Sequence, residues 1–226
     1  QILGMQYSPE TNEHQIVAVN TLNNQTKTIY TFVATKYRML LRLAAFSSIS
    51  FEYYCLTTDY EKTSDMTMHA VHTEWGNVTY SRKFPASAMS TMHYHESSNL
   101  LYGIYQKQVP ERGYVSILWV IDPISKVFHE LHTWEDPNEQ LNLHIGAVDP
   151  VKSVYLAQVI NYTDPSARTS LVYHVDLNKG DRYDRKPAYP IKLDESQYGR
   201  TPYIDFFYPG KGDLFCMHAH PNYVSL

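Results

Sequence analysis

Two histidines stand two residues apart in a strand-like run of the sequence. They are His93 and His95, within Met92-His93-Tyr94-His95. Alternate residues of a strand point to the same side, so both imidazoles would share one face. Two imidazoles can supply half of a zinc site, which needs three or four ligands. They are therefore the first candidates for a metal site, which would also need one or two ligands from neighbouring strands.

Carboxylates for acid and base catalysis are present, but no pair has a spacing that forces two side chains together. Asp205, in the strand-like run from Tyr203 to Phe207, is the best placed to line a channel. Asp122 and Asp176 each follow an apolar run and open a polar turn, where an aspartate accepts hydrogen bonds from its own turn. We therefore expect no catalytic residue and no cofactor, and the sequence favours a protein that is not an enzyme.

The three tryptophans bear on carbohydrate binding, because an indole face can stack on a sugar ring. Trp119 lies in the middle of an apolar run and is expected in the core. Trp75 and Trp134 remain as stacking platforms for a lectin.

Three sequons for N-linked glycosylation occur, at Asn24, Asn77 and Asn161. Asn24 and Asn77 fall in the same turn of successive repeats, which are described below, and Asn161 falls in a different connection. All three are expected to be exposed, as glycan acceptors must be. The sequons favour a secreted or lumenal glycoprotein.

The longest irregular stretch, residues 181–200, has the composition of a binding segment. It combines tyrosines and arginines, which are frequent in interface hot spots. These residues are Tyr183, Arg185, Tyr189, Tyr198 and Arg200. A linker rich in proline and charge explains the stretch equally well. Polar connections of variable length, such as residues 106–114, are expected to gather on one face, as binding loops do on a rigid scaffold.

Composition and charge set the fold class and exclude some partners. The chain has 226 residues, among them 20 Tyr and 8 Phe, and a formal net charge of -4. Aromatic and β-branched residues favour strands. Scattered cations give no surface for a nucleic-acid backbone, and no apolar run approaches the roughly 18 to 20 residues that cross a bilayer. We expect one mainly β domain with no nucleic-acid partner and no membrane span.

The strands that must position these residues recur along the chain. Gly4, Cys55, Gly103, Leu156 and Cys216 each follow an apolar or aromatic pair, at intervals of 51, 48, 53 and 60 residues. A second marker, where a strand-like run ends and a polar turn opens, follows 16 to 20 residues after each of the first four. Each repeat of about 50 residues therefore contains four short strands, named A to D, with the first marker in B and the second at the end of C.

Four antiparallel strands in such a unit resemble the blade of a β-propeller. Segments 97–103 and 149–155 resemble the A-to-B hairpins of many propellers, and the likeness extends over nearly the whole chain. The resemblance implies an all-β propeller or propeller fragment, in which each sheet buries its faces against its neighbours. The signatures of WD, kelch, Tyr-Trp-Thr-Asp and sialidase repeats are absent from the sequence, so the resemblance concerns the fold and no particular family.

The phase of the repeat predicts a chain that starts and ends inside a blade. A single propeller region, 1–226, divides into pieces at about 1–38, 39–88, 89–138, 139–198 and 199–226. The first piece holds strands B, C and D, and the last holds A and B alone. Open sheet edges are association hazards, so we expect another segment or chain to cover them. The alternative is a shorter first repeat, with its A strand at Ile2 to Tyr7.

The repeat weakens the metal hypothesis. Aligned with the next repeat, His93 and His95 correspond to Gly146 and Val148, which do not bind metals. We therefore expect no metal site, and histidines that serve packing or the surface.

The repeat also argues against a disulfide between the two cysteines. Cys55 and Cys216 occupy the same position in blades that are not adjacent. A disulfide requires roughly 4 to 7 Å between Cα atoms. Both cysteines are expected to be buried thiols.

The leading functional hypothesis is a non-catalytic binding or scaffold segment of a propeller, within a larger extracellular glycoprotein or assembly. Its partner would be a protein, a glycan or the rest of its own polypeptide. One alternative is a lactonase-like or glycosidase-like hydrolase that uses His93, His95 or Asp205 at the axial channel. Another is a lectin that uses Trp75 and Trp134.

Overall fold

The computed structural model describes residues 1–34, 37–59, 65–84, 87–111, 113–136, 138–149, 151–161, 163, 169–178, 183–184, 190–192, 203–208, 213–219 and 224–225. Every regular element in this part of the chain is a β-strand. The described residues thus contain no helix, which confirms the prediction of an all-β chain.

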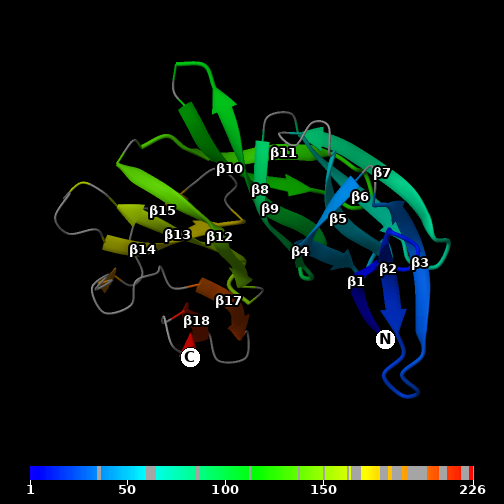
Figure 1. The fold of residues 1–226 in the computed structure, drawn as a ribbon. Helices are drawn as coiled ribbons and strands as arrows, with labels where there is room; N and C mark the ends of the chain where they lie inside the picture. Colours follow the sequence, from blue (N-terminus) through cyan, green and yellow to red (C-terminus); the bar gives the residue numbers. More distant parts are fainter. Residues whose placement is uncertain are drawn as a thin grey trace.

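The strands form five antiparallel sheets that follow one another along the chain (Figure 1). Sheet 1 holds β1 (Ile2–Ser8), β2 (Glu13–Val19) and β3 (Thr26–Val33). Sheet 2 holds β4 (Tyr37–Ser47), β5 (Glu52–Asp59), β6 (Met66–His72) and β7 (Asn77–Phe84). Sheet 3 holds β8 (Ser87–His95), β9 (Leu100–Val109), β10 (Gly113–Ile121) and β11 (Phe128–Trp134). Sheet 4 holds β12 (Glu139–Asp149), β13 (Val154–Asn161), β14 (Thr169–Asp176), β15 (Tyr183–Asp184) and β16 (Pro190–Lys192). Sheet 5 holds β17 (Tyr203–Tyr208), β18 (Asp213–Ala219) and β19 (Val224–Ser225).

The sheets are arranged as the repeat predicts. Consecutive strands pair as a meander, and the A strands of sheets 2 to 5 lie next to one another in the order β4, β8, β12, β17. Figure 1 shows the sheets fanned out from blue to red. Sheet 1 holds strands B, C and D, because β1 pairs with β2 without a register shift, as the B and C strands of sheets 2 to 4 do, whereas every A-B pair carries a shift. Sheet 5 has a third strand, β19, where only A and B were expected. The sequence did not predict it, because two residues are too few to show an alternating pattern.

The core lies between the sheets, and alternate residues of one strand face opposite neighbours. In β5, Tyr53 and Cys55 pack into the cluster shared with sheet 1, whereas Tyr54 and Leu56 pack into the cluster shared with sheet 3. This alternation follows from the two-residue period of a strand. All four side chains are buried, and burial of an aromatic or large aliphatic side chain contributes about 1.5–3 kcal/mol. A B strand is therefore apolar on both faces.

The strand register confirms four of the five repeat markers and corrects the fifth. Cys55 pairs with Ala44 of its A strand and Gly103 with Met92, but the corresponding residue of sheet 4 is Ala157, which pairs with Gly146. The marker of sheet 4 is therefore Ala157 and not Leu156. The sequence pattern placed the apolar pair at Val154-Tyr155, whereas the pair that precedes the marker is Tyr155-Leu156. Cys55 is a buried free thiol as expected, and burial raises its pKa to about 12.

The marker position is small because a bulky C-strand residue covers it. Gly103 pairs with Trp119, whose ring lies over the glycine: a Cβ built there would meet Trp119 Cζ2 and the Thr91 carbonyl oxygen, each at 2.3 Å. Gly4 occupies the same position in sheet 1, which has no described A strand, and a Cβ there would meet nothing within 4 Å. The same repeat position therefore has no room for a side chain in sheet 3 and open space for one in sheet 1.

Substituting these two glycines tests the packing directly. Gly103→Ala is expected to destabilise the chain by about 3 kcal/mol, the upper part of the usual range for overpacking a core. Gly4→Ala is the matched control and is expected to change stability by no more than about 0.5 kcal/mol. Urea unfolding of both variants measures the difference, and equal effects would show that the indole of Trp119 does not cover Gly103.

Candidate binding face

The A-B and C-D turns lie at one end of the strands, because both turns of an antiparallel meander fall at the same end. The described A-B turns are residues 48–51, 96–99 and 151–153, and the described C-D turns are 20–25, 73–76, 122–127 and 177–178. We call this end of the sheets the turn face. Hydrogen bonds join its turns: Thr73 N donates to the Phe51 carbonyl in sheet 2, and Leu177 N to the Ser153 carbonyl in sheet 4, both at 2.9 Å.

In sheets 1 to 4 the last residue of the C strand, or the residue after it, caps its own C-D turn. Asp122 Oδ1 accepts from Ile124 N at 2.8 Å, and Asp176 Oδ1 from Asn178 N at 2.9 Å. This confirms the turn-capping interpretation of the two aspartates. The hydrogen bonds also lower the pKa of Asp122, so the cap stays charged.

The last residue of the A strand caps the A-B turn in the same way in sheets 2, 3 and 4. Ser47 Oγ accepts from Ser50 N at 3.3 Å, His95 Nδ1 from Ser98 N at 3.3 Å, and Asp149 Oδ1 from Val151 N at 2.9 Å. His95 therefore corresponds to Asp149, and the alignment of His95 with Val148 and of His93 with Gly146 is wrong by one residue. The error follows from the repeat marker of sheet 4, because the alignment was taken from Leu156 and the register places the marker at Ala157.

His93 faces sheet 4 and lies beside Tyr155, with ring centroids 6.0 Å apart. Its Nε2 is buried without a hydrogen-bond partner among the described residues. Burial lowers the pKa of His93 to about 4, so the ring is neutral at pH 7. No group of three or more His, Cys, Asp or Glu side chains in the described part of the chain is placed to hold a metal. The described residues thus give His93 and His95 no third ligand.

A second neutral histidine links three strands of sheet 2. Thr57 Oγ1 lies 2.9 Å from Nε2 of His69, and Ser81 Oγ lies 2.9 Å from Nδ1. A serine beside a histidine is the start of a catalytic triad, but here Thr57 stands where a carboxylate would stabilise the imidazolium. Burial lowers the pKa of His69 to about 4. The arrangement is a cross-strand polar ladder, and sequence reasoning missed it because it requires the register of β5, β6 and β7.

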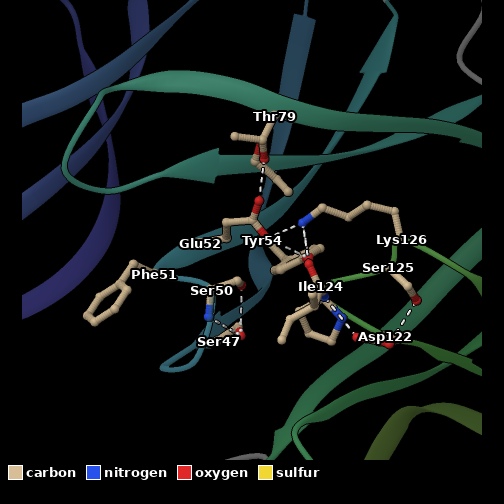
Figure 2. A network of polar contacts seen from close by, with 12 residues as sticks. Ser47, Ser50, Phe51, Glu52, Tyr54, Thr79, Asp122, Ile124, Ser125 and Lys126 are labelled. Atoms are coloured by element: carbon tan, nitrogen blue, oxygen red, sulfur yellow. Dashed lines mark hydrogen bonds and ion pairs between the residues drawn. The ribbon is translucent and has the colours of Figure 1, made fainter.

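An ion pair between a half-buried lysine and a buried carboxylate joins sheets 2 and 3 at the turn face (Figure 2). Lys126, in the C-D turn of sheet 3, reaches Glu52 at the start of β5. The Glu52 carboxylate also accepts from the Tyr54 hydroxyl at 2.9 Å and from Thr79 Oγ1 at 2.5 Å. Lys126 Nζ also donates to the Tyr54 hydroxyl at 3.2 Å and to the Pro123 carbonyl at 2.5 Å.

The network keeps the Glu52 carboxylate charged and engaged in hydrogen bonds. Burial raises the pKa of its carboxyl, but hydrogen bonds from Lys126, Thr79 and Tyr54, with the charge of Lys126, outweigh burial and hold the pKa below its ordinary value. Burial and the charge of Glu52 raise the pKa of Tyr54, which keeps its proton and remains a donor. A carboxylate with three donors is poorly suited to abstract a proton, so the network acts as a clamp between sheets.

The backbone of Lys126 supports this role. The residue four positions after the one that opens the C-D turn (Asn20, His72 or Asp122) has a positive φ in three sheets: 57° at Asn24, 64° at Gly76 and 61° at Lys126. Asn and Gly tolerate this conformation, whereas lysine adopts it at a cost. The contacts of Lys126 with sheet 2 offset that cost.

Exposed apolar side chains gather on the turn face. Of the eleven large hydrophobic residues that are exposed in the described part of the chain, seven lie in its turns. They are Leu22, Ile49, Phe51, Trp75, Ile124, Val127 and Val151. Three of the others, Tyr7, Val33 and Tyr114, lie toward the opposite ends of their strands.

The structure places the remaining sequence-based candidates as follows. Asn24 and Asn77 are exposed in or beside C-D turns, and Asn161 is half-buried at the end of β13. Trp119 and Trp134 are buried, so Trp134 is not the stacking platform that was expected; Trp75 is 73 % exposed. Trp134 ends the D strand β11 and packs into the cluster shared with sheet 4.

The binding segment 181–200 is described only in part. Tyr183 begins β15 and pairs with Val175, but Arg185, Tyr189, Tyr198 and Arg200 lie outside the described residues. Asp205 lies in β17, and its side chain is likewise outside the described ones.

No protein-family model and no curated protein matches this sequence. Solved structures do. TolB from Acinetobacter baumannii superposes with a TM-score of 0.59 at 8% identity, over 98% of this chain and 47% of that chain. The β-propeller domain of Cps50 (Swd1) from Myceliophteria thermophila gives 0.56 at 12%, over 92% and 63%. The β-propeller domain of the Trilobed protease from Pyrococcus furiosus, which has an open velcro topology, gives 0.55 at 11%, over 99% and 61%.

This chain has a β-propeller fold. It spans about half the length of TolB and about three fifths of the two propeller domains. Identities of 8 to 12% establish the propeller fold alone, and one propeller scaffold can serve unrelated functions. The described residues include no helix of the length and hydrophobicity needed to span a bilayer.

Removing Lys126 from the clamp is expected to destabilise the propeller. Lys126→Met should cost about 1.5–3 kcal/mol at pH 7, the usual range for hydrogen bonds to a charged group. The pKa of Glu52 is lower folded than unfolded, so this contribution exists above about pH 4.3 and is lost as the pH falls further. Lys152→Met, in the exposed A-B turn of sheet 4, is the control. Equal unfolding free energies for the two variants would contradict the clamp.

The two neutral histidines predict acid sensitivity. The pKa of His69 and of His93 is about 4 folded, below the value of about 6.5 in an unfolded chain. Below pH 6.5 the unfolded state binds more protons, so stability falls as the pH drops from 6.5 to 4. Urea unfolding at pH 7 and pH 5 should show a smaller pH effect for His69→Gln and His93→Gln than for the original chain. His129→Gln, at an exposed site, is the control, and an unchanged pH effect in the first two variants would refute the prediction.

Proposed function

We propose that this chain is a non-catalytic binding segment of a β-propeller within an extracellular or lumenal glycoprotein, and that it engages a protein partner through the turn face. The supporting observation is the concentration of exposed apolar side chains in the A-B and C-D turns. Large exposed apolar patches on soluble proteins mark interaction sites.

The turn face is suited to a partner that is apolar and carries little charge. Phe51 and Ile124 are exposed at the edges of two turns that the Glu52–Lys126 pair ties together (Figure 2). Asp122 and Lys126 are engaged within the protein and are not free to bind a charged partner. Aromatic and aliphatic anchors on a fixed backbone lose little conformational freedom when they bind.

The clamp contributes to binding by holding the turns in place. It joins the A-B side of sheet 2 to the C-D turn of sheet 3, so Phe51 and Ile124 keep a fixed relation to each other. Preorganised surfaces bind more tightly because less ordering is needed on association. Catalysis has no comparable support, because Glu52 is saturated with donors and His95 caps a turn.

Site-specific photo-crosslinking tests the proposal. A benzophenone amino acid replaces Ile124 on the turn face or Tyr114 at the opposite end; both side chains are 65% exposed, which makes them a matched pair. In the secretory pathway of a eukaryotic host, or in its secreted medium, position 124 is expected to give a discrete protein adduct and position 114 none.

The adduct must then be confirmed with purified components. The captured protein is expected to bind the original chain and the Tyr114→Asp variant equally, and to bind Phe51→Asp and Ile124→Asp at least tenfold more weakly, the equivalent of about 1.4 kcal/mol. Adducts at position 114 alone, or binding that Phe51→Asp and Ile124→Asp leave unchanged, would refute the use of the turn face.

A further inference from the structure

One residue of the turn face is held in a way that hydrophobic docking does not require. The indole of Trp75 is stacked on the ring of His72, with centroids 3.8 Å apart and planes inclined by 8°. His72 is buried, and its Nδ1 accepts from the backbone amides of Glu74 and Trp75 at 3.3 Å each. One face of the indole is therefore covered and fixed, while 73 % of the residue remains exposed.

The turn that carries Trp75 cannot shift easily. Gly76 has a φ of 64°, and a Cβ built on it would lie 2.6 Å from the carbonyl oxygen of Ile29 in sheet 1. Backbone packs against backbone at this point. The orientation of the following residue, Asn77, is thus set by contact between sheets.

Asn77 lies directly opposite His72 in the pairing of β6 with β7. Side chains of opposed residues leave a sheet on the same side, with Cβ atoms about 4.5–5.5 Å apart. The exposed Asn77 side chain therefore emerges beside the His72–Trp75 stack. It is also the acceptor of the sequon Asn77-Val78-Thr79.

We propose that Asn77 carries an N-linked glycan whose first N-acetylglucosamine packs on the open face of Trp75. This rests on the glycoprotein part of the proposed function. A pyranose ring has one face of C–H groups, which is apolar and suits the electron-rich face of an indole. Attachment to Asn77 makes the contact intramolecular, so it forms without a free ligand.

The modification itself requires only ordinary glycosyl transfer. A lipid diphosphate-linked oligosaccharide donates its glycan: the bond from sugar C1 to the diphosphate oxygen breaks, and a bond from C1 to Asn77 Nδ2 forms. The amide loses one proton and the lipid diphosphate leaves.

The chain provides an internal comparison. Asn24 lies in the corresponding turn of sheet 1, and the residue two before it is Leu22, which is exposed and has no aromatic face. The places equivalent to Trp75 in the turns of sheets 1 and 3 hold Asn23 and Ser125. A glycan on Asn24 therefore lacks a platform of this kind.

Fluorescence quenching distinguishes a stacked sugar from a free one. Trp119 and Trp134 are buried, so quenching by acrylamide reports mainly on Trp75. The chain is secreted from a eukaryotic host, and three forms are compared: glycosylated, trimmed by endoglycosidase H to one sugar, and stripped by peptide N-glycosidase F, which leaves Asp at position 77. Intact mass and peptide mapping establish which asparagines are modified.

The expected result is that one sugar on Asn77 is enough to protect Trp75 from acrylamide. The trimmed form should show a quenching slope close to that of Trp75→Leu, and the stripped form a much steeper one. The trimmed form should also unfold about 2–4 °C higher than the stripped form, the shift that follows from a modest stabilisation in a chain of this size. Trp75→Leu should lose this increment, and Asn24→Gln should leave both readouts unchanged.

The outcomes that would overturn the proposal are separate from one another. An unmodified Asn77 overturns it and also removes this support for a glycoprotein. A modified Asn77 with equal quenching in the trimmed and stripped forms overturns the stacking while leaving the glycoprotein intact. Protection of Trp75 by millimolar free chitobiose in the stripped form, without protection by the attached sugar, would make Trp75 a lectin subsite instead.

Discussion

Sheets 2 and 3 each have two apolar faces and depend on a sheet on either side to cover them. β5 illustrates the constraint, since Tyr53 and Cys55 face sheet 1 while Tyr54 and Leu56 face sheet 3. Stability is therefore shared between neighbouring sheets and does not reside within any one of them. Sheet 1 shows the reverse case, because in its β1 strand Ile2 is 61% exposed and the space beside Gly4 is open.

The turn face follows from the same constraint. Packing between sheets fixes the ends of the strands, and local caps from Ser47, His95, Asp149, Asp122 and Asp176 then hold the turns. Because the backbone is already ordered, exposed apolar residues on the turns are presented in defined positions. The Glu52–Lys126 pair interrupts the repeat, since sheets 3 and 4 carry Leu100 and Val154 where sheet 2 carries Glu52. A pair that sheets 3 and 4 do not repeat gives this part of the turn face a surface of its own.

The fold could be read from the sequence because its signals are local. Apolar runs, markers that follow an apolar or aromatic pair, and polar turns recur every 50 residues or so, which sufficed for the blades, the buried Cys55 and the capping role of Asp122. A further local signal was overlooked: Asn24, Gly76 and Lys126 each stand four residues after the residue that opens the C-D turn, where φ is positive.

The site could not be read in the same way, because it depends on register and on distant contacts. The marker of sheet 4 is Ala157 and not Leu156, and this one-residue error carried over to the alignment of His93 and His95. Glu52 and Lys126 are 74 positions apart, and no local pattern pairs them. The segment 106–114 was expected to be a loop, yet β9 continues to Val109 and β10 begins at Gly113, because hydrogen bonding extends an exposed hairpin beyond its apolar residues. The sequence also does not distinguish the exposed Trp75 from the buried Trp134, because Trp134 is buried by contacts with sheet 4.

Native-state hydrogen exchange on the 226-residue chain, read by mass spectrometry, tests the shared stability of the sheets most directly. The amides of β5 and β9, in B strands covered on both faces, are expected to exchange slowest and with a common opening free energy, while β1 and β3 exchange faster. Exchange of β5 and β9 with unrelated free energies, or exchange of β5 as fast as that of β3, would show that each sheet is stable by itself and would contradict the account.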